Sequence, residues 1–366
     1  MREEPPVLTD TPPSARGGPT LVVIGTGGLA RGLCYALAVT AGAPLDVVVV
    51  GRSPERAAEV CYVASARAAL AGAPVTFRPR ATDLSGGDAL AELLSALAPA
   101  GLVLAASSQS PWERATAPSA WTALVQRAGF GLTLPFQAES ALRAGRALAA
   151  ARPGAWFLNG CFPDAVNPIL AAAGVPVLSG IGNAGLMAAG IQAALGLPDQ
   201  RDLRVLAHHV HLHAPHGDCE EARAWVGGEP VPGVGSLLAA QRAADRAELN
   251  HVTGLAAAVV VRGLLTGEET HTSLPGPLGL PGGYPVLLRG GRLELRLPAG
   301  LDLAGAVAFN QRAAAYDGVV VDGDRVRFTE PAAPELPREF TVAEIEPVTG
   351  LFHEFRARLR ERSPHL

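Results

Sequence analysis

The histidines of this chain are concentrated in one place, and imidazole is the side chain that most readily exchanges a proton near neutral pH. Five of the nine lie in the stretch H-H-V-H-L-H-A-P-H, residues 208–216. If residues 208–213 form a strand, His209, His211 and His213 share one face of it. Such a face could bind a metal, line a polar cavity or be structural. Since no carboxylate or cysteine is obviously placed to complete a metal shell, we expect a functional site without a metal.

A glycine-rich loop near the N-terminus carries a second kind of chemistry. It follows the apolar run Leu21–Ile24 and opens the helical stretch Leu29–Val39, the context that a dinucleotide-binding loop of pattern G-x-G-x-x-A requires. Small residues there permit a tight turn and a close approach to a pyrophosphate, and the helix N-terminus offers N–H groups. A tight turn that binds nothing is the alternative. The predicted cofactor-binding residues of the loop are Gly25, Thr26, Gly27, Gly28, Leu29 and Ala30.

The end of the second predicted strand bears on which dinucleotide binds. An NAD site usually has an acidic residue there to hold the ribose 2′-hydroxyl, but this chain has Arg52 and Ser53. Arginine can pair with a 2′-phosphate and the serine hydroxyl can donate to it, so NADP is favoured, with NAD possible. An ordinary exposed arginine before a helix is the other interpretation. Ala106 and Ser107, after the fourth strand, are further candidates for cofactor contact.

Several segments together resemble the lactate/malate dehydrogenase superfamily. His216-Gly217-Asp218-Cys219-Glu220, followed by Trp225 and by G-G-E-P-V at 227–231, looks like the catalytic H-G-D-S…W…G-G-x-P-[LV] segment of that family. Asn159 before Pro163-Asp164 is similar to its N-P-x-D turn, and residues 177–183 resemble its next strand and G-S-G-T turn. The order and approximate spacing agree over residues 20–235.

The resemblance implies roles for particular residues. His216 would be the proton donor and acceptor, with Asp218 or Asp164 as its orienting partner, and Asn159 would order the nicotinamide or polarise the substrate. Trp112 and Arg114 would sit on a loop that closes over the site. The remaining substrate-contacting candidates are Asn183, His211 and His213.

The chain also departs from that family. The family places an aspartate and a carboxylate-binding arginine soon after the G-S-G-T turn, whereas residues 184–190 read A-G-L-M-A-A-G. We therefore expect an NAD(P)-dependent oxidoreductase whose ketone, alcohol, imine or amine substrate is not a standard 2-hydroxy acid, with specialised metabolism as one setting. One alternative is an NAD- and metal-dependent hydrolase similar to the family 4 glycosidases, although Asn183 stands where those carry a metal-binding cysteine. A catalytically inactive cofactor-binding protein is the other alternative.

The elements that must position these residues alternate between strand and helix. Buried-strand patterns at 21–24, 46–50, 75–77, 101–106 and 155–158 have helical stretches between them, which predicts a doubly wound parallel α/β sheet of the Rossmann type. Beyond residue 160 the pattern is α+β, and the resemblance implies a lactate/malate-dehydrogenase-like fold. We expect a disordered tail at 1–18, a dinucleotide-binding domain at 19–159 and a substrate domain with a C-terminal helix at 160–366. Other expected elements are a strand entering 205–213, a long helix at 237–265 and helices at 183–195, 301–316 and 348–362.

Composition limits the remaining possibilities. With 366 residues, 48% hydrophobic and 17% charged, the chain can build a large core. A net charge of -4 disfavours nucleic acid as a partner, and the absence of lysine excludes Schiff-base and P-loop lysine chemistry. Four cysteines without C-x-x-C spacing and no signal-peptide or membrane-span pattern favour a cytoplasmic protein. A small-molecule substrate is the expected partner, and the resemblance implies a homodimer or homotetramer.

Overall fold

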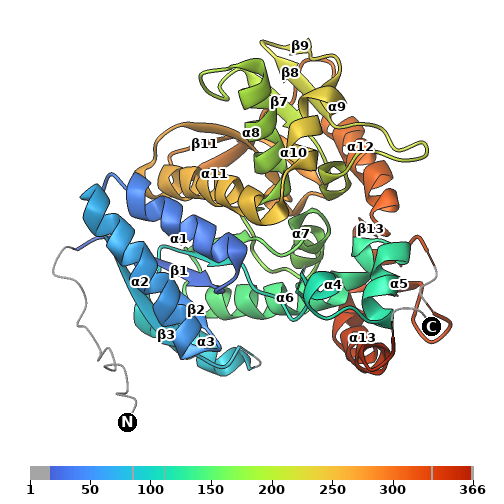
Figure 1. Ribbon diagram of the computed structural model, residues 1–366, viewed down its shortest axis with the longest axis horizontal. Coiled ribbons are helices and arrows are strands. Elements are labelled where there is room, and N and C mark those ends of the chain that lie inside the picture. The colour runs from blue at the N-terminus through green and yellow to red at the C-terminus, as the bar shows by residue number, and fades with distance from the viewer. Residues whose placement is uncertain (1–16, 85, 111, 331–332, 364–366) are drawn as a thin grey trace.

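A six-stranded parallel sheet forms the centre of the computed structural model, which describes residues 17–84, 86–110, 112–330 and 333–363 (Figure 1). Its strand order is β3-β2-β1-β4-β5-β6, so the order reverses between β1 and β4. This arrangement confirms the predicted Rossmann sheet, and ligands of such sheets bind beyond the carboxyl ends of the strands at the reversal. The strands are β1 Thr20–Ile24, β2 Leu45–Gly51, β3 Val75–Ala81, β4 Gly101–Leu104, β5 Trp156–Asn159 and β6 Ser179–Gly180. The expected tail lies almost wholly outside the described residues.

Helices cover both faces of this sheet because its strands are apolar on both sides. Val22 and Ile24 join the core formed with α3, α6 and α7, whereas Leu21 and Val23 join the core formed with α1 and α2. Successive residues of a strand point to opposite faces, so one continuous apolar run serves both cores. The helices of this part are α1 Gly28–Thr40, α2 Pro54–Ala71, α3 Gly87–Leu97, α4 Glu113–Thr116, α5 Ala120–Ala128, η1 Phe130–Thr133, α6 Leu134–Ala151 and α7 Pro163–Ala172.

The second half of the chain is α+β, as expected, and contributes three antiparallel sheets, each of three strands. The sixth strand of the central sheet, β6, also comes from beyond residue 159, the expected end of the first domain. The strands are β7 Leu203–Leu206, β8 Arg223–Val226, β9 Glu229–Pro230, β10 Thr270–Pro275, β11 Gly283–Arg289, β12 Arg292–Leu295, β13 Val319–Asp322, β14 Arg325–Phe328 and β15 Glu339–Thr341. The helices are α8 Asn183–Leu195, η2 His209–Leu212, α9 Val234–Leu237, α10 Ala239–Ala243, α11 Arg246–Thr266, η3 Pro277–Gly279, α12 Leu303–Tyr316, η4 Val342–Glu344 and α13 Ile345–Arg360.

Two of the expected elements differ from the structure. The strand expected to run into the histidines ends at Leu206, and the histidines continue as the short 3-10 helix η2. The long helix expected over 237–265 is divided into α9, α10 and α11. Ala244 and Asp245 adopt extended backbone angles there, and the Asp245 carboxylate accepts a hydrogen bond from the Ala247 N–H, which makes it the N-cap of α11.

Helix α11 packs directly on α1 at a point where both helices have glycine (Figure 1). A Cβ atom on Gly254 would lie 2.2 Å from the carbonyl carbon of Gly32, so the two backbones touch. Among the described residues, α11 is the one helix long and apolar enough to cross a membrane, with 21 residues and a mean hydropathy of 1.3. Ala257, Val260 and Val261 are nevertheless buried with α1 and the sheet, as in a core helix.

This contact generates a prediction about Gly254. Alanine normally stabilises a helix interior by about 1 kcal/mol relative to glycine. We expect Gly254→Ala to destabilise the protein by about 1–3 kcal/mol instead, because the added methyl group must push two backbones apart. Gly350 on α13 is the matched control, since no atom lies within 4 Å of its Cβ position. Urea unfolding should show opposite signs for Gly254→Ala and Gly350→Ala; equal effects would contradict the contact.

Candidate active site

A groove of about 450 Å³ runs across the carboxyl ends of the strands, where the sheet order reverses. The glycine loop, Arg52, His209 and Arg246 all line it. Around His209 the groove joins a second cavity of about 610 Å³, which is lined by the loop after β4, by α5 and η1, and by the second half of the chain. The structure thus places the predicted cofactor loop and one predicted histidine on one continuous surface.

The glycine loop fits a pyrophosphate. Gly25 has φ +132°, and a Cβ atom there would lie 2.6 Å from the Ala105 carbonyl oxygen, so the turn requires glycine. Gly27 is the N-cap of α1 and has open space at its Cβ position, while no side chain among the described residues caps this helix. The first N–H groups of α1 have no acceptor within the helix, and Gly27, Gly28 and Leu29 line the groove, which suits an anion site at a helix N-terminus. Thr26 also lines the groove, and Ala30 is buried behind it.

The groove has two arginines near the predicted 2′-phosphate position, whereas only one was expected from the sequence. Arg52 and Arg56 both line the groove, and Arg56 is a residue that the sequence analysis missed. Its position in the first turn of the helix that follows Arg52 could have pointed to it. The expected role of Ser53 is not supported, because its hydroxyl accepts from the Arg56 N–H at 3.2 Å and donates to Glu55 at 2.7 Å. Ala106 and Ser107 line the groove and a neighbouring pocket of about 260 Å³ beside Arg52.

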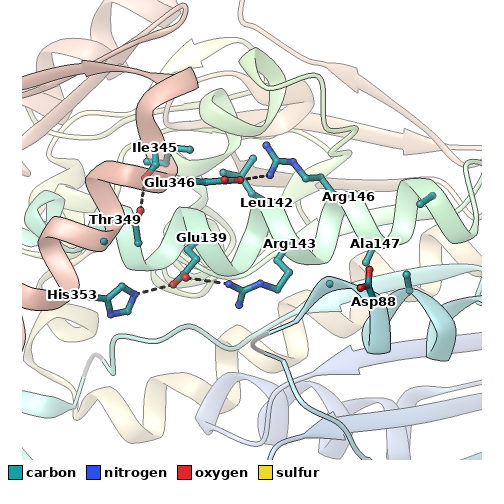
Figure 2. Close-up of a pocket in the computed structure, with 14 residues that line it drawn as sticks. Asp88, Glu139, Leu142, Arg143, Arg146, Ala147, Ile345, Glu346, Thr349 and His353 are labelled. Carbon is teal, nitrogen blue, oxygen red and sulfur yellow. Dashed lines mark hydrogen bonds and ion pairs between the residues drawn. The ribbon is translucent and has the colours of Figure 1, made fainter.

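Behind that pocket, Figure 2 shows a further cavity of about 570 Å³ between α3, α6 and α13. Glu139 lies between His353 and Arg143, with contacts of 3.1 Å to each, and Arg146 contacts Glu346 at 2.7 Å (Figure 2). Both arginines of this cavity already have carboxylate partners, so it offers no free cation to an anionic ligand. We therefore place the candidate site in the groove.

His209 is the histidine with the environment of an acid–base group. Its Nδ1 lies 2.8 Å from the Asp317 Oδ2, and its ring stacks on Phe130 at 4.7 Å between centroids, with Phe162 edge-on at 5.2 Å. Burial alone would lower the pKa of His209, but the charge and the hydrogen bond of Asp317 outweigh it and raise that pKa. The same pair holds the pKa of Asp317 below its usual value although burial opposes it. Both shifts favour the charged forms of the imidazole and the carboxylate.

The backbone of His209 is also held in place. Its N–H donates to the Asp164 Oδ1 at 3.0 Å, and the Asn183 amide nitrogen lies 3.0 Å from each oxygen of the same carboxylate. Asp164 therefore orients this histidine through the main chain, whereas the sequence analysis paired it with His216. Asn183 lines the groove, but its side-chain N–H groups point at Asp164.

The other histidines of the stretch do different things. Because the segment is a 3-10 helix, His209, His211 and His213 do not share a strand face. His211, a candidate substrate contact, lines neither cavity: the ring is buried, its Nδ1 accepts from the His208 N–H at 2.8 Å, and burial lowers its pKa to about 4. His213 lines the second cavity. In the described part of the chain no group of three or more His, Cys, Asp or Glu is arranged to hold a metal ion.

The surroundings of His216 differ from those of His209, and they make His209 the better acid–base candidate. His216 lies exposed at the rim of the second cavity, with its ring edge-on to Tyr316 at 5.7 Å. Within the described ranges no carboxylate lies within ion-pair distance of it, and Asp218 is exposed on the same loop without lining the cavity. His216, Gly217 and Asp218 are thus exposed, in a turn that is closed by the hydrogen bond from the Cys219 N–H to the His216 carbonyl oxygen.

Asn159 is likewise structural rather than free to contact a ligand. It is fully buried, its amide nitrogen donates to the Cys161 carbonyl at 3.2 Å and to Asn167 at 2.9 Å, and its Oδ1 accepts from the Cys161 N–H at 2.9 Å. These bonds shape the turn between β5 and α7. Gly160 and Cys161, not Asn159, line the groove.

Helix α13 holds the segment that carries Trp112 and Arg114 against the second cavity. The buried Gln109 accepts from the Trp121 indole at 3.1 Å and from Arg356 at 3.2 Å, and it donates to Glu113 at 2.8 Å. Arg360 pairs with Glu113 at 2.6 Å. The guanidinium of Arg356 also lies 3.8 Å from the centre of the Phe136 ring. Hydrogen bonds thus anchor the base of this loop, while Trp112 and Arg114 line the second cavity.

No protein-family model matches the sequence, and no curated protein matches it. Solved structures of lactate and malate dehydrogenases share the fold, which confirms the expected fold class. A lactate dehydrogenase from a Medee basin deep-sea metagenome library has a TM-score of 0.54 at 14% identity, over 81% of this chain and 96% of that one. Malate dehydrogenase from Picrophilus torridus has 0.56 at 13%, over 93% and 99%. Lactate dehydrogenase from Eimeria maxima with NADH and oxamate has 0.52 at 14%, over 83% and 93%.

The loop anchor can be tested by removing Arg356. We expect Arg356→Leu to lower the free energy of unfolding by about 1.5–3 kcal/mol, because a charge-assisted hydrogen bond to the buried Gln109 is lost. Arg358 lies on the same helix with its side chain 59% exposed, and Arg358→Leu should change stability by less than about 0.5 kcal/mol. Equal effects of the two substitutions in urea unfolding would contradict the anchor.

Proposed function

We propose that the protein is an NADP(H)-dependent oxidoreductase that reduces the carbonyl or imine carbon of a small molecule, or oxidises the corresponding alcohol or amine. One observation carries the proposal: His209, which is paired with Asp317, lines the same groove as a glycine loop whose shape fits a pyrophosphate. The lactate and malate dehydrogenase fold supports a dehydrogenase. By the resemblance we also propose a homo-oligomer, and we propose a cytoplasmic location.

Different residues of the groove would bind different parts of the cofactor. The glycine loop and the first turn of α1 would hold the pyrophosphate, and Arg52 with Arg56 would hold a 2′-phosphate as a pair of cations. Ala106 and Ser107 would contact the adenosine half from the end of β4. When bound, the nicotinamide supplies or accepts the hydride.

His209 would move the proton that balances the hydride. Its Nδ1 is engaged by Asp317, so Nε2 is the nitrogen left for the substrate heteroatom. In the direction of reduction the imidazolium donates its Nε2 proton to the developing alkoxide or amine. In the direction of oxidation the neutral ring accepts that proton. Asp317 stabilises the charged ring and fixes its orientation, and Phe130 and Phe162 restrict the approach of water.

The pH dependence of reduction tests the pair. Because reduction needs protonated His209 and Asp317 raises its pKa, the rate should fall only as pH rises through a value above about 6.5. Asp317→Asn removes the charge that raises the pKa, so this fall should move to lower pH.

His209→Asn should lower turnover by about 10²–10⁴-fold with unchanged cofactor affinity. His216→Asn should lower turnover far less than His209→Asn does; the reverse order would return the acid–base role to His216.

Cofactor choice tests the two arginines. The wild type should bind NADPH more tightly than NADH, and Arg56→Ala or Arg52→Ala should weaken NADPH binding by about 10- to 150-fold, the equivalent of a charge-assisted hydrogen bond of about 1.5–3 kcal/mol. NADH affinity should change little. Arg67 lies on α2 outside the groove, so Arg67→Ala should leave both affinities unchanged. Fluorescence titration measures all of these, and equal wild-type affinities would refute the preference for NADP.

A further inference from the structure

The second cavity is larger than a small hydroxy acid needs. It encloses about 610 Å³ beyond His209, and cavities of about 300–1,000 Å³ hold drug-sized ligands. A molecule the size of lactate at His209 would leave most of this volume to water. The space therefore indicates a substrate with a substantial group attached to its reacting carbon.

The charges in the cavity are unbalanced. Its acids are neutralised by the protein, since Asp317 pairs with His209 and Glu113 with Arg360. Arg246, at the start of α11, and Arg114 have no carboxylate partner in the parts of the chain that the structure describes. Burial in the wall of the cavity lowers the pKa of Arg246. The arginine also lies near enough to His209 for its charge to oppose the rise in the His209 pKa that Asp317 causes. An unpaired, partly desolvated guanidinium favours an anionic ligand.

The walls of the cavity also present flat aromatic surfaces. Trp112 from the loop after β4 is 39% exposed, and Tyr316 at the end of α12 is half-buried beside His216. Aromatic rings left accessible in a cavity bury surface only when a ligand arrives, and they prefer planar groups.

From these observations we propose that the substrate carries an anionic group that binds Arg246 and a planar, ring-bearing group that lies along Trp112 and Tyr316, with its reacting carbonyl or imine at His209. The proposal rests on the proposed function. It assigns the recognition of the anion to α11, in place of the segment after β6, where residues 184–190 carry no arginine.

Three related ketones separate the features of the proposed substrate. Phenylpyruvate has a ketone, a ring and a carboxylate, pyruvate lacks the ring, and phenylacetone replaces the carboxylate by a methyl group. Each is titrated by calorimetry into protein saturated with NADP⁺, where no reduction can take place and only binding is measured. We expect phenylpyruvate to bind at least about tenfold more tightly than either of the others, the equivalent of about 1.4 kcal/mol.

Variants then assign the two parts of the site. Arg246→Gln should weaken phenylpyruvate binding to the level of phenylacetone, and Trp112→Ala should weaken it toward that of pyruvate. Arg292 on β12 is exposed and also has no ion-pair partner among the described residues, but it lies outside the cavity, so Arg292→Gln is the matched control and should change nothing. Equal binding of the three ketones, no binding of phenylpyruvate, or an unchanged affinity in Arg246→Gln would overturn the proposal.

Failure of the proposed function would look different. In that case neither NADPH nor NADH would bind, or bound phenylpyruvate would not be reduced when NADPH replaces NADP⁺. Repeating the three titrations without cofactor measures the cavity alone, so the preference for a planar anion is decided either way.

Discussion

The contact between α1 and α11 determines how the two halves of the chain meet. Because Gly32 and Gly254 bring the two backbones together, the N-terminal end of α11 reaches the glycine loop, where a Cβ atom on Gly28 would lie 2.5 Å from the Asn250 amide nitrogen. The same placement puts Arg246 in the wall of the groove. One close helix crossing thus aligns the surface proposed for the cofactor with the surface proposed for the substrate.

The proposed proton-transfer pair depends on a second long-range contact. Asp317 follows α12, more than a hundred residues beyond His209, and no carboxylate lies in residues 184–190 to take its place. An imidazole needs a carboxylate at hydrogen-bond distance to be charged in a partly apolar pocket. That carboxylate can come from any part of the chain, provided that the fold places it beside the imidazole. A site without the expected aspartate can therefore still have the chemistry of an acid–base histidine.

Much of the fold could be predicted from the sequence, because the features involved are local. Runs such as Leu21–Ile24 are apolar at every position, which specifies a strand covered on both faces, and the glycine loop directly after it needs no distant residue to be recognised. The break between α10 and α11 was missed because Ala244 and Asp245 do not interrupt the apolar spacing. Only the capping bond from the Ala247 N–H to Asp245 reveals it.

The site was harder to predict because two local signals competed. His216-Gly217-Asp218-Cys219 matches a motif, and His209 does not, yet the environment of an acid–base group comes from what surrounds the ring. Around His209 these are Phe130 and Asp317, from segments far apart in the chain, whereas His216 lies at the rim beside Tyr316. The Asp317 carboxylate raises the pKa of His209 against the opposing effect of burial, and among the described residues no carboxylate lies within ion-pair distance of His216. For this chain the neighbours of each histidine in the fold are therefore better evidence for its role than the motif in which it occurs.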